Sequence, residues 1–174
     1  MRRVERRSIT SRRSQRNTAV IAFFVLRYSL SQTCSYPSMT LLRSHTLTVS
    51  IALPCQQVYE FASNPENLPR WAVGLGKSVR RQGDAWLVEA TQGWVSVRFA
   101  PPNEYGVLDH VVTISPENVV TVPMRVIANG SGAEVLFTLF QSPEMTDEQF
   151  TTDRELVASD LAKLKQILEV PNAT

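Results

Sequence analysis

The stretch HTLTVSIALPCQQVYEFASNPENLPRW, residues 45–71, begins with a strict alternation of apolar and polar side chains. In residues 45–53, Leu47, Val49 and Ile51 fall on one side of the chain, while threonine and serine residues fall on the other. Successive side chains of an extended chain point to opposite faces, so the pattern is typical of a strand with one buried face. We therefore predict a half-buried strand at this point.

A short helix and a proline-rich hinge follow the predicted strand. Residues 54–62 carry apolar side chains at the i, i+3, i+4 spacing of one helical face. Asn64 then suits a helix N-cap, and Pro65 suits the first helical position, where no amide donor is needed. Pro69 disfavours a helical conformation at the residue before it, so this second helix should last about one turn. The hinge ends by presenting Trp71.

Six further apolar segments, separated by glycine, asparagine and proline turns, predict six strands. They comprise residues 76–82, 85–91, 94–100, 105–114, 119–128 and 133–141. Strands joined by such short turns form an antiparallel meander. From Thr146 the period becomes helical: Thr146 and Gln149 match a capping box, and an apolar stripe runs to residue 168. A helix over 146–169, ended by Pro171, would be about 36 Å long and would need a curved sheet to cover it.

This order of elements resembles the START-like helix-grip fold of the SRPBCC superfamily, which includes polyketide cyclases and dehydrases, plant pathogenesis proteins and lipid carriers. Residues 44–71 carry the resemblance, with a V-Y-x-F helix followed by N-P-E-N-L-P-x-W. The element order extends it to about residue 170. It implies an α+β fold, with a curved antiparallel sheet of about seven strands, two short helices after the first strand, and a long C-terminal helix packed on the sheet. It also implies a cavity between sheet and helix, closed at one end by the short helices, but little shared chemistry.

The charge distribution divides the chain into a leader and a domain. Residues 1–38 carry eight arginines and one glutamate, 8 − 1 = +7, which leaves 10 basic and 15 acidic residues, or −5, for the rest. Arginine and serine enrichment is typical of a transit peptide, and the apolar run 19–26 resembles a signal-peptide core but is too short for a membrane span. A basic nucleic-acid-binding arm is also open, although no aromatic pattern accompanies the arginines. We favour a disordered leader or an upstream-start artefact, with a START-like domain over 39–174.

The chemistry-bearing residues are few. Cys34 and Cys55 indicate neither a disulfide framework nor a metal site, and they favour a cytoplasmic location. No nucleophile motif, phosphate loop or metal-ligand spacing is present, so we expect no metal and no cofactor. We also expect no nucleic-acid partner for the domain and no membrane span. His45 and His110 are the only histidines.

Strand alternation assigns candidate side chains to the two faces of the sheet. If the apolar sets face inward, His110 and Met124 point into the cavity, while Arg98, Asp109 and Arg125 form a charge cluster on the wet face. A neutral buried His110 would offer one donor and one acceptor to a carbonyl or a phenol, as a ligand anchor or as an acid/base. A purely structural histidine is the simpler interpretation. The predicted ligand-binding residues are Trp71, Trp86, Val97, Phe99, His110, Met124 and Leu161.

Three functions remain open for such a domain. The first is binding of a small hydrophobic or aromatic molecule between the sheet and the C-terminal helix, because the sequence supplies almost only apolar walls. The second, implied by the family resemblance, is a polyketide cyclase or dehydrase-like activity with His110 as acid/base. The third is an interaction or co-chaperone-type module that uses the outer face of the sheet. A solidly packed interior would favour that third function.

Overall fold

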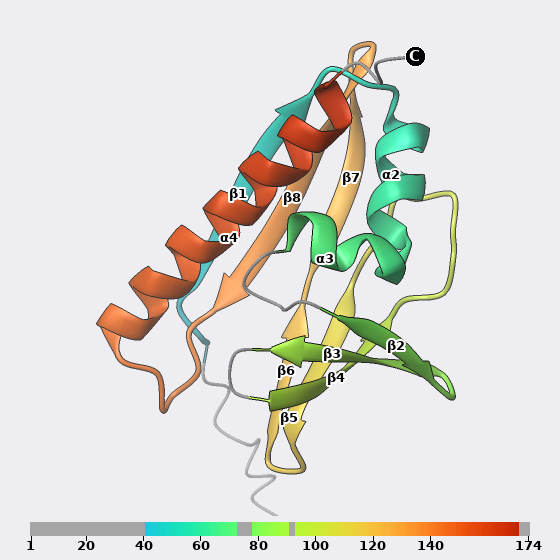
Figure 1. Ribbon diagram of the computed structural model, residues 1–174. Coiled ribbons are helices and arrows are strands. Elements are labelled where there is room, and N and C mark those ends of the chain that lie inside the picture. The colour runs from blue at the N-terminus through green and yellow to red at the C-terminus, as the bar shows by residue number, and fades with distance from the viewer. Residues whose placement is uncertain (1–40, 73–77, 91–92, 171–174) are drawn as a thin grey trace, which may run out of the picture. The chain divides into compact units, whose positions relative to one another are not determined.

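A computed structural model describes residues 41–72, 78–90 and 93–170 of the chain, which all fall in the unit Leu41–Thr174. The predicted leader with Cys34, the predicted strand start at Gly76, the strand end at Thr91 and the helix stop at Pro171 lie outside the described residues. The fold is α+β, with eight strands and a long C-terminal helix (Figure 1). The elements are β1 (Ser44–Ile51), α2 (Cys55–Ser63), η1 (Pro65–Asn67), α3 (Leu68–Trp71), β2 (Val79–Gln82), β3 (Ala85–Ala90), β4 (Gly93–Phe99), β5 (His110–Ser115), β6 (Asn118–Val122), β7 (Met124–Asn129), β8 (Gly132–Phe140) and α4 (Asp147–Glu169).

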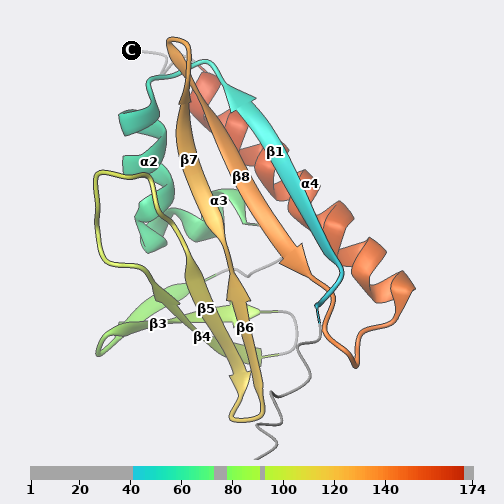
Figure 2. The same ribbon diagram turned by 180° about the vertical axis from the view of Figure 1, so that it is seen from behind.

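The strands form one curved antiparallel sheet in two parts. One part has the strand order β2-β3-β4-β5-β6 and is the predicted meander; the other has the order β1-β8-β7. Figure 2 shows the two parts meeting where β6 runs into β7. The helices α2, α3 and α4 all lie on the same side of the β1-β8-β7 part, as the two opposite views show (Figures 1 and 2). The core is therefore enclosed between that side of the sheet and the helices.

The predicted strand over 119–128 is in fact two strands, β6 and β7, which raises the strand count from about seven to eight. Pro123 separates them because it has no amide hydrogen to donate to the ladder. The Met124 amide donates instead to the Asp109 carboxylate, at 2.9 Å, and the Pro123 carbonyl accepts from the Thr138 amide. Backbone hydrogen bonds thus continue across the break and hold the two parts of the sheet together.

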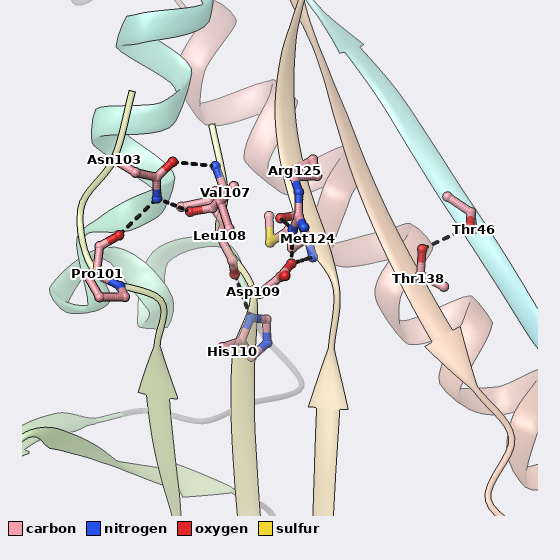
Figure 3. A network of polar contacts seen from close by, with 10 residues as sticks. All are labelled: Thr46, Pro101, Asn103, Val107, Leu108, Asp109, His110, Met124, Arg125 and Thr138. Carbon is pink, nitrogen blue, oxygen red and sulfur yellow. Dashed lines mark hydrogen bonds and ion pairs between the residues drawn. The ribbon is translucent and has the colours of Figure 1, made fainter. Parts of the chain in front are cut away.

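The predicted strand over 105–114 begins later, at His110, because a side chain holds the preceding segment in a loop. Asn103 donates to the carbonyls of Pro101 and Val107 and accepts from the Tyr105 and Val107 amides (Figure 3). Gly106 in this loop has φ +68°, and a Cβ there would lie 2.0 Å from the Val126 carbonyl oxygen. The loop therefore needs glycine where it passes β7.

The hinge after α2 differs in one respect from the prediction. The Asn64 side chain accepts from the Glu66 amide, and Pro65 occupies the first turn, which confirms the predicted N-cap. Pro69, however, does not end the helical segment. Leu68 keeps helical dihedral angles, φ −50° and ψ −47°, and α3 follows with Pro69 in its first turn, where its missing amide hydrogen costs nothing.

Helix α4 matches the sequence pattern closely. The Thr146 hydroxyl accepts from the Gln149 amide, and the Gln149 side chain accepts from the Thr146 amide, which completes the predicted capping box. Of the predicted stripe, Phe150, Leu161 and Leu164 are buried, and Val157 and Leu168 pack against the core as partly buried residues. The helix thus holds its apolar side against the sheet.

Candidate ligand cavity

A cavity of about 240 Å³ lies between the sheet, the short helices and α4. Its walls come from α2 and α3, from β4 to β8, from Leu108 and from α4. Nearly all the side chains that line it are apolar. A dry engineered cavity of about 150 Å³ is large enough to bind benzene. This one can therefore accommodate a molecule of roughly two fused rings.

Six of the seven predicted ligand-binding residues line this cavity. They are Trp71, Val97, Phe99, His110, Met124 and Leu161. Trp86 does not line it. Trp86 on β3 is directly opposite Val97 on β4, so its side chain is on the same face of the sheet as the cavity. It is, however, one strand closer than Val97 to the β2 edge of the sheet. Whether any of these residues binds a ligand stays a prediction.

Trp71 is placed at the cavity by the proline-rich hinge. It ends α3, is 4% exposed, and lines the cavity with its neighbours Leu68 and Ala72. Its indole N–H has no hydrogen-bond partner among the described residues. Two other aromatic residues, Tyr59 and Trp94, do not line the cavity. Tyr59 accepts the Asn103 amide at its hydroxyl, and Trp94 lies exposed on β4 with the Arg80 guanidinium 4.6 Å from its ring.

His110 is the buried polar residue of the core and the first residue of β5. Its ring packs against those of Phe99 and Phe137, whose centroids lie 5.1 Å and 6.1 Å away. Nδ1 lies 3.0 Å from the Leu108 carbonyl oxygen (Figure 3). A carbonyl oxygen can only accept, so Nδ1 carries the hydrogen and donates it. In the neutral ring Nε2 is then left with a free lone pair.

Burial keeps His110 neutral. Desolvation lowers the pKa of the imidazole below its ordinary value, and the hydrogen bond to the Leu108 carbonyl opposes this shift only in part. The direction of this pKa shift agrees with the sequence-based expectation that His110 is buried and neutral. One part of that expectation changes, however. The single N–H of the neutral ring is already used within the protein, so the ring has no donor left for a ligand.

Two carboxylates on α4, which the sequence analysis did not single out, also line the cavity. Asp153 and Asp160 are seven residues apart, so they share one helical face, and both are partly exposed. Burial raises the pKa of Asp153 above its ordinary value. Leu156 lines the cavity too and is 48% exposed, which places the solvent-facing side of the cavity along this helix. The sequence does contain a signal for these two positions. Each aspartate lies four residues before an apolar residue of the stripe, Asp153 before Val157 and Asp160 before Leu164.

The predicted charge cluster on the outer face is an ion pair with a structural task. Arg125 and Asp109 pair directly, and each side chain is little more than one-third exposed. Because Asp109 also accepts the Met124 amide, the pair stabilises the bend after Pro123 (Figure 3). Arg98 is exposed on β4. This group lies away from the cavity lining and carries no part of the candidate site.

Among the described residues, no cluster of three or more histidine, cysteine or acidic side chains is arranged to hold a metal ion. In the same part of the chain, no helix has both the length and the apolar content to cross a membrane. Cys55 is a free thiol whose sulfur lies 3.6 Å from the Val126 carbonyl oxygen.

Solved structures share this fold, although no protein-family model and no curated protein sequence matches the chain. XoxI from Bacillus cereus is 18% identical, with a TM-score of 0.61, and the match covers 73% of this chain and 96% of XoxI. Aha1 from Colwellia psychrerythraea, solved as a dimer, is 14% identical, with a TM-score of 0.61 and coverage of 76% and 100%. Ara h 8.0201 is 11% identical, with a TM-score of 0.57 and coverage of 74% and 98%. The chain therefore shares the helix-grip fold of these structures.

Proposed function

We propose that this protein binds a small hydrophobic or aromatic molecule in the cavity between the curved sheet and α4. The observation that carries the proposal is the cavity itself, about 240 Å³ of space with apolar walls and one buried imidazole. Ligand sites in proteins are typically concave and apolar, with a few polar groups that orient the ligand. An interaction module would need no such space, so the cavity favours ligand binding over the co-chaperone-type alternative.

The tryptophans provide a direct test of this function. The chain has three, and only Trp71 lines the cavity among them. Replacing Trp86 and Trp94 by phenylalanine leaves Trp71 as the sole source of tryptophan fluorescence. Titrating this variant with apolar molecules of graded size, from single-ring to four-ring, should perturb Trp71 emission and raise the melting temperature for those that fit.

The matched control keeps Trp94 alone, by replacing Trp71 and Trp86, because Trp94 is 45% exposed and outside the cavity. Its emission should not respond to the same molecules. If no molecule in the series changes either Trp71 emission or the melting temperature, the cavity is not a binding site and the proposal is wrong.

A second candidate function, proton-transfer catalysis of the dehydrase type, has one observation in its favour. His110 has a lowered pKa and a free Nε2 lone pair, whereas Asp153, which lines the same cavity, has a raised pKa. Such opposite shifts suit a base and an acid respectively. In a β-hydroxy ketone, Nε2 would take the proton next to the carbonyl, and the hydroxide would leave as water with the proton of Asp153. Formation of the enone, followed by its ultraviolet absorbance, tests this; no enone above the uncatalysed rate rejects it.

A further inference from the structure

The cavity contains a hydrogen-bond acceptor with a fixed orientation. The His110 ring packs against Phe99 and Phe137 and is tied at Nδ1 to the Leu108 carbonyl. Rotating the ring by half a turn would break the Nδ1 hydrogen bond and leave a buried carbonyl oxygen unpaired, which is costly. The tautomer with hydrogen on Nδ1 and a lone pair on Nε2 is therefore the stable one.

The neighbours of His110 leave its Nε2 acceptor to the cavity. The strand residues paired with His110 are Phe99 and Val122, and neither side chain can donate a hydrogen bond. Met124 and Phe137, which also line the cavity, have no donor in their side chains either. The carboxylates Asp153 and Asp160 come from the opposite, helical wall. A molecule bound in the cavity is thus the natural partner for Nε2.

We propose that the cavity selects apolar ligands that carry a hydrogen-bond donor, such as a phenol or an alcohol, whose O–H binds Nε2 of His110. This inference rests on the proposed ligand-binding function and specifies its ligand class. A ligand with only acceptors, such as an ether or a ketone, places its lone pairs against another lone pair and gains nothing at this position. The sequence left both polarities open, a donor toward a carbonyl and an acceptor toward a phenol; the hydrogen bond to Leu108 leaves only the acceptor.

The test compares 2-naphthol, which has a donor, with 2-methoxynaphthalene, which has only an acceptor. Both are titrated into the full-length chain, into His110→Phe and into His45→Phe. His45→Phe is the matched control, because it is the same substitution at the other histidine, on β1 and outside the cavity lining. His110→Phe should reduce the preference for 2-naphthol over 2-methoxynaphthalene by about 3- to 10-fold, the effect of one neutral hydrogen bond. His45→Phe should leave the preference unchanged.

A second measurement needs no substitution at His110. In ¹⁵N-labelled His45→Phe the only imidazole is that of His110, so long-range ¹H–¹⁵N spectra report its tautomer directly. We expect hydrogen on Nδ1 and none on Nε2, and a change of the Nε2 shift when 2-naphthol is added but not when 2-methoxynaphthalene is added.

The outcomes separate the inference from the function on which it rests. Hydrogen on Nε2, or equal effects of His110→Phe on the two probes, would overturn the donor selectivity while leaving ligand binding intact. Failure of both probes to bind would overturn the inference, and failure of the whole graded series as well would overturn the proposed function. A ratio that changes in His110→Phe, together with the expected tautomer, would support both.

Discussion

His110 shows how one residue can be both structural and available for function. Its two nitrogens have different tasks: Nδ1 satisfies the Leu108 carbonyl, and Nε2 stays free beside the cavity. The sequence analysis treated a structural histidine and a functional histidine as alternatives. The structure removes that choice, because the first hydrogen bond determines which chemistry the second nitrogen offers.

The buried imidazole should make stability depend on pH in a defined direction. The pKa of His110 is lowered in the folded protein, so between the unfolded value near 6.5 and the lower folded value the unfolded chain binds more protons. The free energy of unfolding should therefore fall as the pH drops below about 6.5. In His110→Phe this part of the decline should vanish, although the Leu108 carbonyl loses its donor and the variant is less stable at every pH.

Urea unfolding at several pH values between about 5 and 8 measures this effect. The acidic side chains that line the same cavity, Asp153 and Asp160, are present in both proteins, so the difference between the two pH profiles isolates His110. His45→Phe is the control for a histidine substitution that leaves His110 in place, and it should keep the decline that His110 causes. If the free energy of unfolding of His110→Phe fell with pH as steeply as that of the unchanged chain, the imidazole would not be buried in its neutral form.

Helix α4 has two different kinds of buried leucine along one stripe. Leu161 is 2% exposed and borders the cavity, whereas Leu164 is fully buried and does not line it. A side chain beside a void has fewer neighbours to lose than one packed on all sides. The helix therefore serves two purposes: Leu164 packs it against the core, and Leu161 forms part of the cavity wall.

Truncating these leucines should separate the two purposes. Leu161→Ala and Leu164→Ala should each cost about 2 to 5 kcal/mol of unfolding free energy, with Leu161→Ala nearer the lower limit. Only Leu161→Ala should enlarge the cavity and admit bulkier probes. Chemical unfolding measures the cost, and Glu155→Ala, an exposed change on the same helix, should stay within about 0.5 kcal/mol. A cost under about 0.5 kcal/mol for Leu161→Ala would contradict its burial.

The cavity results from the way the sheet bends across the fold. The strands β4 to β6 belong to one part of the sheet and β7 and β8 to the other, yet all contribute to its wall. Pro123, Asp109 and Gly106 shape the junction between the parts, although none of them lines the cavity. Residues that do not line the cavity thus shape the bend of the sheet around it.

Because the cavity leaves space beside some core residues and not others, adding a methylene should have opposite effects on stability at two buried valines. Val97 lines the cavity, whereas Val88, one strand away, is fully buried and does not. Val97→Leu should stabilise the chain by about 0.5 to 2 kcal/mol by filling the void, and should weaken probe binding. Val88→Leu should cost about 1 to 3 kcal/mol through overpacking. Melting curves of both variants provide the measurement, and destabilisation of equal size would indicate that the interior around Val97 is already full.

Much of the candidate site followed from local periodicity, and the errors have identifiable causes. Period-two alternation correctly oriented Val97, Phe99, His110 and Met124 toward one face, because side-chain direction in a strand depends on the chain alone. Trp86 has the correct face but the wrong distance from the cavity, which alternation does not encode. The predicted helix stop at Pro69 is wrong, because proline is also compatible with the first turn of a helix. The predicted strand over 119–128 is wrong in its continuity, because Pro123 interrupts it.

By itself, the sequence determined the order of the elements and their inner and outer faces, because these depend on hydrophobic period, caps and turns within a few residues of each position. The resemblance of residues 44–71 and of the element order to a known family implied the helix-grip fold. Only the tertiary structure decided the volume of the cavity, the entry of Asp153 and Asp160 into its wall, and the tautomer of His110. Each of these depends on where packed segments finally lie in space. The carbonyl that orients the imidazole is only two residues away, where the preceding loop enters β5, but the alternation pattern does not specify the dihedral angles of that junction.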